Sequence, residues 1–370
     1  MRTLRYLLGS RFRRDLLSLK RHRMEVAPNI LFVAGSQVDL QWVIPAYEAS
    51  VVRGLSCAFA GPGLAVPVGA QYIDVTVHLL RFVRARITVT STTGLNRTHM
   101  PRSSIRRVAV PHSLVSLHMA YPKGTFDGYT DIFCCGAHHY TEIEAMNREK
   151  HMQERRPVRI GYGKLERLLM VRSDEKTCDK SIKHVLIGPS WGSGNILQAM
   201  GASLIRSLLA DGYKVTLRPH PSFFTYGDAL VAPLIKEFCR QRGFFLENSL
   251  EESRALWTAD FMVTDYSGFA MEFAFVRELP VLYVDVPPKV LNPDWRSLKL
   301  EPIEISVRDR IGLTVPPIVD EVLLGLKQLE GDSKSWILRI QQERKSSWFN
   351  YGEFGDACAE ELQRMLDEIQ

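Results

Sequence analysis

The chain has 370 residues, and at roughly 100–200 residues per domain this length predicts about two domains. Hydrophobic residues make up 45% and charged residues 24%, a composition that is typical of globular proteins and excludes disordered and fibrous ones. None of the six cysteines forms a C-x-x-C pair, so we expect reduced thiols packed as small apolar groups, without a disulfide framework or a zinc cluster.

The net charge of +6 is concentrated at the amino terminus. Residues 1–23 hold eight Lys or Arg and one acid, so this segment carries +7 and the rest of the chain carries −1. A basic amphipathic helix is predicted over residues 3–20, with its apolar side chains near one face: Leu4, Leu8, Phe12, Leu16 and Leu19. Such a helix can contact an anionic membrane surface; the alternatives are a helix packed on its own domain and a disordered arm. No nucleic-acid surface is expected on the body of the protein.

Neither a secretory signal nor a membrane span is predicted. The long uncharged stretch Gly54–Ile73 contains four Gly and two Pro, and few of its residues are strongly apolar. Because a spanning helix needs about 20 mostly apolar residues, we interpret this stretch as a loop-rich soluble segment.

Short apolar runs alternate with helical patterns along the rest of the chain, which favours an α/β fold with parallel sheets covered by helices. In the first half, strands are predicted at Asn29–Ala34, Arg86–Thr90, Arg107–Val110 and Asp131–Cys135, and a helix at 138–154. In the second half, strands are predicted at His184–Ile187, Lys214–Leu217, Phe261–Val263 and Val281–Val284. Helices are expected there at 195–211, 228–242 and 268–277, with closing helices at 319–345 and 354–369.

Charged and turn-rich residues between 148 and 183, including the polar run Arg172–Lys183, separate the two series of elements. We therefore expect three parts: a basic amphipathic arm at residues 1–25, a first Rossmann-like domain at 26–160 and a second one at 161–370.

The loops after three strands of the second half are suited to a phosphate, because ligands of open α/β sheets bind beyond the carboxyl ends of the strands. The first loop, Gly188–Gly194, combines small residues with amides at a helix start, and its candidate contacts are Ser190, Gly192 and Ser193. It lacks the Walker A and G-x-G-x-x-G spacings, so a plain connecting loop is the alternative.

The second loop contains Arg218 and His220, in the run Arg-Pro-His-Pro. Its two prolines restrict the backbone around the histidine. The imidazole there can donate a hydrogen bond to a phosphate or act as an acid or base.

The third loop, Thr264–Gly268, lies between a predicted strand and a helix. Ser267 and Gly268 begin that helix, where backbone amides favour an anion. Asp265 could order this loop or be only a helix cap. Glu272, one turn into the helix, could accept hydrogen bonds from ribose hydroxyls or be a surface acid.

In the first half, His112 follows a predicted strand and is the candidate base. The other histidines nearby, including His118, His138 and His139, do not form an H-E-x-x-H arrangement. The chain also contains no D-x-D, the arrangement with which many nucleotide-sugar enzymes hold Mn or Mg. We therefore expect neither a metal site nor a cofactor.

Several motifs resemble those of the CDP-glycerol glycerophosphotransferases, which are the polymerases and primases of teichoic acids and capsules: Gly161–Leu165, Arg218–Pro221, Thr264–Gly268 and Leu279–Tyr283. The resemblance covers roughly residues 105–285. It implies a GT-B fold, in which two Rossmann-like domains face each other across a cleft, the acceptor on 26–160 and the nucleotide donor on 161–370. It also implies metal-independent transfer and peripheral attachment to the cytoplasmic face of the membrane, which the arm at 1–23 would mediate.

The resemblance also assigns roles. His220 would contact the donor pyrophosphate and His112 would be the base, while Ser267 and Gly268 would bind phosphate and Asp265 would order their loop. Two motifs depart from the family pattern. The family has Trp-His-Gly-Thr where this chain has Pro-His-Ser-Leu at 111–114, and it has a second serine where this chain has Gly268.

The sequence thus predicts a transferase that moves a polyol-phosphate or sugar unit from a nucleotide-activated donor, with CDP or CMP favoured. The acceptor would be a growing surface glycan or its lipid-linked precursor. GT-B sugar transferases such as CMP-Kdo users share the implied scaffold. The alternatives are a nucleotide-sugar epimerase or hydrolase on that scaffold and a non-catalytic partner in glycan assembly.

Overall fold

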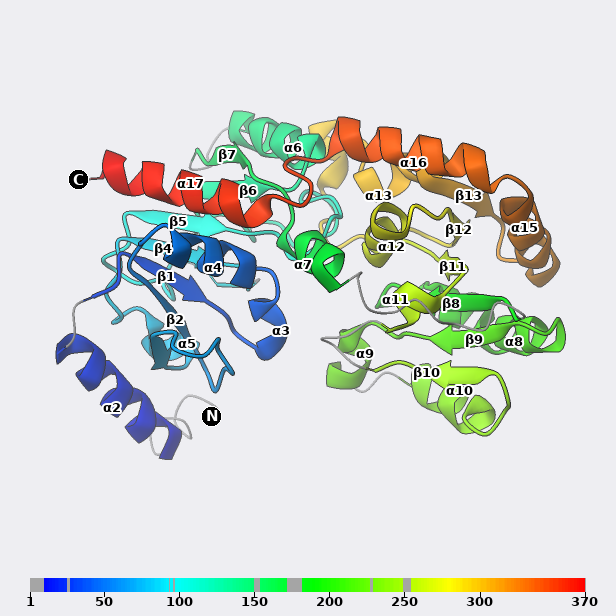
Figure 1. Ribbon diagram of the computed structural model, residues 1–370, viewed down its shortest axis with the longest axis horizontal. Coiled ribbons are helices and arrows are strands. Elements are labelled where there is room, and N and C mark those ends of the chain that lie inside the picture. Colours follow the sequence, from blue (N-terminus) through cyan, green and yellow to red (C-terminus); the bar gives the residue numbers. More distant parts are fainter. Residues whose placement is uncertain are drawn as a thin grey trace. The chain divides into compact units, whose positions relative to one another are not determined.

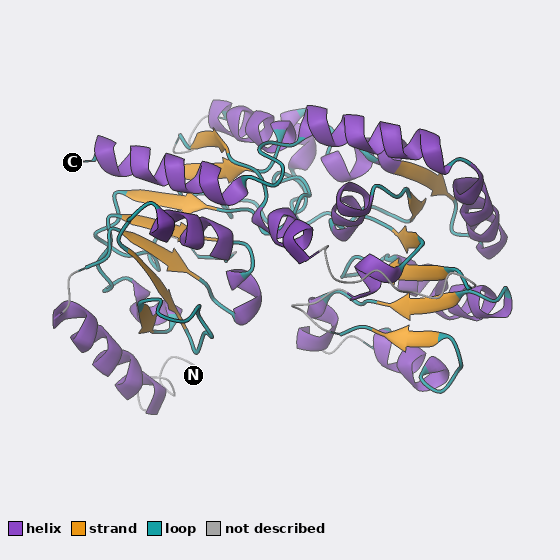
Figure 2. Cartoon of the chain, in the orientation of Figure 1, coloured by secondary structure: helices purple, strands orange, loops and turns teal. Residues whose placement is uncertain are grey.

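The computed structural model describes residues 10–24, 27–92, 94–95, 97–149, 154–171, 182–226, 229–248 and 254–369. The described chain divides into two compact units (Figure 1), each built on one parallel sheet. Unit 1 combines the described residues up to His112 with those of Pro122–Arg167 and Trp348–Gln370. Unit 2 combines Ser113–Tyr121 with the described residues of Leu168–Ser347. In both units helices flank the sheet (Figure 2), which confirms the α/β class.

The sheet of unit 1 has seven strands in the order β3-β2-β1-β4-β5-β6-β7. Its strands are β1 (Ile30–Val33), β2 (Cys57–Gly61), β3 (Tyr72–Asp74), β4 (Ile87–Thr90), β5 (Arg106–Ala109), β6 (Asp131–Cys134) and β7 (Arg156–Arg159). Ile30 of the central strand pairs with Cys57 on one side and Ile87 on the other. The continuous apolar run of β1 is fully buried, as expected for a parallel strand covered on both faces.

Helices accompany this sheet (Figure 1), and most of them lie between its strands in the sequence. They are α3 (Gln37–Leu40), α4 (Ile44–Val52), α5 (Val77–Leu80), α6 (Ala137–Arg148), α7 (Gly163–Val171), which crosses the boundary between the units, and the carboxyl-terminal α17 (Phe354–Glu368). Helix α17 lies against α4 and completes the core of unit 1 with five buried side chains: Phe354, Cys358, Leu362, Met365 and Leu366.

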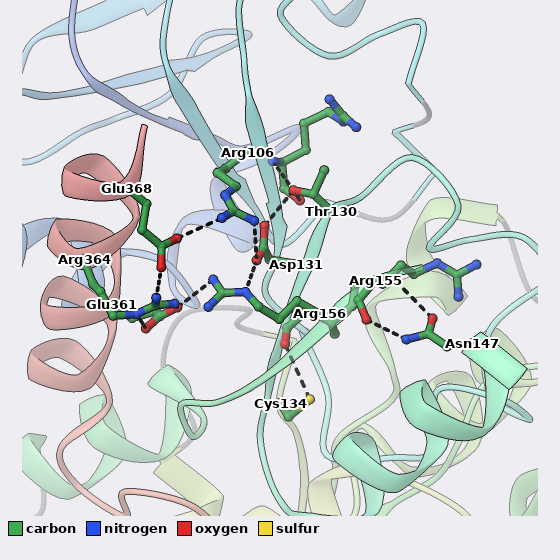
Figure 3. A network of polar contacts seen from close by, with 12 residues as sticks. Arg106, Thr130, Asp131, Cys134, Asn147, Arg155, Arg156, Glu361, Arg364 and Glu368 are labelled. Atoms are coloured by element: carbon green, nitrogen blue, oxygen red, sulfur yellow. Dashed lines mark hydrogen bonds and ion pairs between the residues drawn. The ribbon is translucent and has the colours of Figure 1, made fainter. Parts of the chain in front are cut away.

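The polar side of α17 is held to the sheet by ion pairs (Figure 3). The Nε atom of Arg156 lies 2.6 Å from the buried carboxylate of Asp131, and its Nη2 atom lies 2.7 Å from Glu361 of the helix. Arg106 of β5 reaches Glu368 at 2.9 Å. These contacts join β5, β6 and β7 to the helix that follows them by about 200 residues of sequence.

The sheet of unit 2 has six parallel strands in the order β10-β9-β8-β11-β12-β13. They are β8 (His184–Gly188), β9 (Lys214–Leu217), β10 (Phe244–Leu246), β11 (Phe261–Thr264), β12 (Val281–Val284) and β13 (Gly312–Val315). The helices are α8 (Ile196–Ala210), α9 (Pro221–Tyr226), α10 (Val231–Phe238), α11 (Arg254–Thr258), α12 (Phe269–Arg277), η1 (Trp295–Leu298), α13 (Ile303–Ser306), α14 (Arg308–Ile311), α15 (Val319–Gly331) and α16 (Ser333–Ser347).

The predicted strands are all present, but the structure adds five: β2, β3, β7, β10 and β13. The interpretation of Gly54–Ile73 as loop-rich was wrong for β2, whose residues Ala58, Phe59 and Ala60 are fully buried. Two of these three are alanines, so burial between neighbouring strands, rather than β-propensity, stabilises this strand. The single closing helix expected at 319–345 is two helices, because the chain breaks at Asp332.

The units also differ from the expected boundaries in two segments. Ser113–Tyr121 belongs to unit 2 although it precedes residue 160, and Trp348–Gln370 belongs to unit 1 although it follows residue 161. The predicted polar run Arg172–Lys183 lies mostly outside the described residues.

The basic amphipathic segment forms helix α2 (Ser10–Met24), and residues 1–9 of the prediction lie outside the described residues. The helix packs on unit 1, which was one of the alternatives. The buried carboxylate of Asp15 accepts hydrogen bonds from the amide and hydroxyl of Thr76, at 3.1 and 2.8 Å. His22 accepts the Arg84 amide through Nε2 at 3.1 Å. These contacts set the rotation of the helix, so the predicted apolar face was wrong at Leu16, which is 46% exposed.

Among the described residues, no helix is long and apolar enough to cross a membrane.

Candidate functional site

Most of the predicted site residues lie at the carboxyl edge of the unit 2 sheet. The chain runs from β8 to β9 on one side and later returns to place β11 on the other, so the strand order reverses between β8 and β11. Ligands of open parallel sheets bind at such a reversal. The loops that end β8, β9 and β11 carry eight of the ten candidates: Ser190, Gly192, Ser193, Arg218, His220, Asp265, Ser267 and Gly268.

Asp265 links the loop after β11 to the loop after β8 by hydrogen bonds. Its side chain is fully buried, and Oδ1 accepts the amide of Ser190 at 2.7 Å. Oδ2 accepts the amide of Ile196, the first residue of α8, at 3.0 Å. The carboxylate therefore holds both ends of the glycine-rich loop that follows β8. It caps the first amide of α8 and not α12, the helix that follows Asp265 in the sequence.

The start of α8 differs from the expectation of amides free for an anion. Asn195 caps the helix by accepting the amides of Leu197 and Gln198 at 2.9 and 3.1 Å. Together with the bond from Ile196 to Asp265, these contacts occupy the first helical amides. Gly192, with a φ of +98°, and the exposed Ser193 form the tip of the loop.

The loop after β11 leads into α12. The hydroxyl of Ser267 accepts the Phe269 amide at 3.3 Å and so caps the helix locally. Glu272, one turn further, is only 4% exposed, which removes the alternative of a surface acid.

His220 and Arg218 are both held in place at the end of β9. The Nδ1 atom of His220 accepts the amide of Ser222 at 3.2 Å, so a neutral imidazole carries its proton on Nε2. Arg218 pairs with Glu247 at 2.9 Å, and its guanidinium lies 5.1 Å from the centroid of the Phe269 ring. The ion pair and the ring fix the position of Arg218 beside the start of α12.

Lys289, which the sequence analysis did not single out, joins the same edge in the loop after β12. Its Nζ atom lies 3.5 Å from the ring centroid of Trp191, and that ring lies 5.9 Å from the ring of His220. Burial lowers the pKa of Lys289 to about 7, against the opposing effect of the negative charges of Asp265 and Glu304. The only sequence signal was its place after a fourth strand of the same sheet edge.

The segment Ser113–Tyr121 also reaches this unit. Ser116 donates to the buried carboxylate of Glu304 through its amide and its hydroxyl, at 2.9 and 2.8 Å. The side chain of Ser113 lies beside Gly268, where an added Cβ would approach the Ser113 Oγ atom to 2.3 Å. This placement arises from tertiary packing, and no sequence pattern predicts it.

His112 is the residue before Ser113 and belongs to unit 1. Its ring lies 5.7 Å from the ring of Trp42, and its carbonyl accepts the Tyr162 hydroxyl at 3.0 Å. Trp42 in turn donates to that hydroxyl at 2.8 Å, so these side chains fix the backbone at His112.

The described residues contain no group of three or more His, Cys, Asp or Glu side chains that could hold a metal ion. The buried His139 is engaged in the fold, because its Nδ1 atom accepts the Cys135 amide at 3.3 Å.

No family model and no curated protein matches the chain. Among solved structures, the wall teichoic acid polymerase TagF has a TM-score of 0.63 at 14% identity, with 99% of this chain and 97% of that chain covered. The UDP-GlcNAc 2-epimerase from Neisseria meningitidis, bound to UDP-GlcNAc, has a TM-score of 0.60 at 9% identity, with 91% and 99% covered. The Methanocaldococcus jannaschii UDP-GlcNAc 2-epimerase in complex with UDP-GlcNAc and UDP has a TM-score of 0.60 at 10% identity, with 92% and 99% covered. These likenesses confirm the two-domain GT-B fold.

Replacing Asp265 by Ala should lower the free energy of unfolding, because two buried amides lose their acceptor. Each unsatisfied donor costs about 1–3 kcal/mol. The shift of the urea midpoint measures this loss. Asp260→Ala is the matched control, since Asp260 accepts one amide, that of His184, at the opposite end of β8. A midpoint for Asp265→Ala equal to that of the wild type would contradict the role assigned to the carboxylate.

The lowered pKa of Lys289 predicts a pH-dependent difference between the wild type and Lys289→Met. The unfolded lysine has a pKa near 10.5 and the folded one about 7, so between these values the unfolded chain binds more protons. The wild type should therefore gain stability relative to Lys289→Met as the pH rises from 7 towards 10. Urea unfolding of both proteins at pH 6, 8 and 9.5 measures the difference, and a constant difference would show that Lys289 keeps its ordinary pKa.

Proposed function

We propose that the protein is a transferase that moves a polyol-phosphate or sugar unit from a nucleotide-activated donor, with CDP or CMP favoured, to a surface glycan or its lipid-linked precursor. The observation that carries this proposal is that His220 and Lys289 both lie near the Trp191 ring, at the carboxyl edge of the unit 2 sheet where Ser267 precedes α12. The motif resemblance to CDP-glycerol glycerophosphotransferases and the fold shared with TagF support it.

The donor pyrophosphate is the group that this sheet edge suits best. In the proposal, the Nε2–H group of His220 and the ammonium of Lys289 bind its phosphate oxygens. Ser267 and Gly268 bind phosphate at the start of α12, where the helix dipole favours negative charge. Arg218 adds positive charge beside them. In this arrangement side-chain cations meet the charge of the pyrophosphate, so the proposed reaction needs no bound metal.

For a polyol-phosphate donor, transfer is an attack of the acceptor hydroxyl on the phosphorus that carries the polyol. A new P–O bond forms to the acceptor, the bond to the bridging oxygen breaks, and the nucleoside monophosphate leaves. We assign to His112 the acceptance of the hydroxyl proton. His220 and Lys289 stabilise the charge that develops on the departing phosphate.

The alternative activity is that of a nucleotide-sugar epimerase or hydrolase, which two of the similar structures favour. Such an enzyme needs no glycan acceptor. Turnover of UDP-GlcNAc in the absence of any acceptor would support this alternative, and acceptor-dependent release of CMP would support the transferase. A non-catalytic partner in glycan assembly would bind the donor without turning it over.

The exposed face of α2 is proposed to contact an anionic membrane surface, at the cytoplasmic side. Asp15, Leu19 and His22 face unit 1, so the opposite face carries the exposed side chains: Arg13, Arg14, Leu16, Leu17, Lys20 and Arg21. Leu17 is 67% exposed among these basic residues. A basic residue near an anionic surface contributes about 1 kcal/mol, which falls off within a Debye length of about 8 Å at physiological salt.

Replacing His220 by Ala should weaken donor binding strongly and abolish transfer, because the ring lies in a loop of the site and not in the core. Ser267→Ala should weaken binding by about 0.5–1.5 kcal/mol, the contribution of one neutral hydrogen bond. Thermal shift with CDP-glycerol, CDP-ribitol, CMP-Kdo, UDP-GlcNAc and GDP-mannose measures both effects, since a ligand at a hundredfold excess over Kd stabilises by about 2.7 kcal/mol.

His78→Ala is the matched control, because His78 is an exposed histidine on α5 of unit 1. Near wild-type turnover by purified His220→Ala would show that His220 is not part of the site.

Changing the four basic residues of the exposed α2 face to Gln should abolish sedimentation with anionic vesicles, while the wild type sediments and is released as salt rises. This variant is cleaner than deleting residues 1–23, because the deletion would also remove the partners of two backbone amides in unit 1.

The control for this experiment changes four exposed basic residues of unit 2 to Gln: Lys236, Arg240, Arg242 and Lys327. We expect that variant to sediment like the wild type. Should the α2 variant still sediment, membrane contact lies on another surface; should the wild type itself stay in solution, α2 serves only to pack on unit 1.

A further inference from the structure

Gly268 is a glycine because of a close approach and not because of its backbone conformation. Its φ is −61°, which any residue adopts. A Cβ atom at this position would lie 2.3 Å from the Oγ atom of Ser113 and 3.2 Å from a methyl group of Val115. The side chain of Ser113 therefore occupies the space in which a side chain of residue 268 would stand.

The hydroxyl of Ser113 is thus presented at the first turn of α12, beside the residue that follows Ser267. The Ser113 hydroxyl accepts a hydrogen bond from the amide of Val115 at 3.4 Å. A serine hydroxyl that accepts from an amide still has its own proton to donate. The hydroxyl of Ser113, which comes from another part of the chain, thus lies beside the residue next to Ser267.

The segment that carries Ser113 is fixed rigidly to unit 2. Ser116, three residues on, makes two hydrogen bonds to the buried Glu304. The carbonyl of Met119 accepts the amides of Leu291 and Asn292, at 3.0 and 3.2 Å. A hydroxyl held in this way loses little conformational entropy when it binds a ligand.

Positions 113 and 268 are also two of the four positions at which the chain departs from the motifs that it resembles; the other two are 111 and 114. At 113 a serine replaces a glycine, and at 268 a glycine replaces a serine. The structure shows that these two residues contact each other, so the two departures form one reciprocal exchange that conserves the total side-chain volume.

We propose that Ser113 is a donor-binding residue, whose hydroxyl donates a hydrogen bond to a phosphate oxygen of the nucleotide in place of a side chain at position 268. This inference rests on the proposed function. It extends the donor site to the segment Ser113–Tyr121, which immediately follows the candidate base His112.

The test is a reciprocal swap, with binding of CDP measured by calorimetry and folding followed by thermal unfolding. Ser113→Ala should bind CDP about 2- to 12-fold more weakly than the wild type with an unchanged melting temperature, because it loses one hydroxyl and keeps the packing. Gly268→Ser should lose binding, since its Cβ would displace the hydroxyl of Ser113 from this place. The double variant Ser113→Gly with Gly268→Ser should regain binding.

The outcomes separate the two proposals. If the wild type binds CDP and Ser113→Ala binds it equally well, the role of Ser113 is refuted while the donor site stands. If the double variant binds CDP no more tightly than Gly268→Ser alone, the reciprocal exchange between positions 113 and 268 is refuted. If the wild type binds neither CDP nor CMP nor UDP, the proposed function fails, and the role of Ser113 fails with it.

Discussion

The buried carboxylate of Asp265 is the contact on which the arrangement of the unit 2 site depends. A short side chain can reach both Ser190 and Ile196 only because β8 and β11 are neighbours in the sheet. Burying a carboxylate is tolerated when donors surround it, and two backbone amides serve here. The same contact fixes the loop that carries Trp191, and the ring of Trp191 holds Lys289 and lies beside His220. The positions of Lys289 and His220, the side chains proposed to bind phosphate, thus depend on Asp265, which is itself fully buried.

Each unit is completed by a segment from the other half of the sequence. Ser113–Tyr121 is anchored in unit 2 by Glu304, and α17 is anchored in unit 1 by Arg106 and Arg156. The first exchange attaches the candidate base His112 by one peptide bond to a residue that contacts Gly268. The proposed chemistry therefore draws on residues that are far apart in the sequence.

The strands of the site could be predicted from sequence, because β8, β9, β11 and β12 are short, mostly apolar and almost wholly buried. Strand β2 could not, since Ala58 and Ala60 carry little strand signal and are stabilised by their neighbours. The loops after the strands were predictable from the rule that ligands bind at carboxyl edges. Lys289 and Ser113 were not, because their importance arises from contacts across the fold with Trp191 and Gly268.

The place of α17 has a consequence for how the chain is made. Residues from Phe354 to Leu366 fill the core of unit 1, together with strands that begin at Ile30. On the ribosome, the sheet of unit 1 is synthesised first, yet its core stays incomplete until residue 366 has been added. The described part of unit 2 ends at Ser347, so all of its strands are available earlier. The order of folding is therefore expected to reverse the order of synthesis, and the amino-terminal unit must wait, with apolar surface uncovered, for a helix translated more than 300 residues after its first strand.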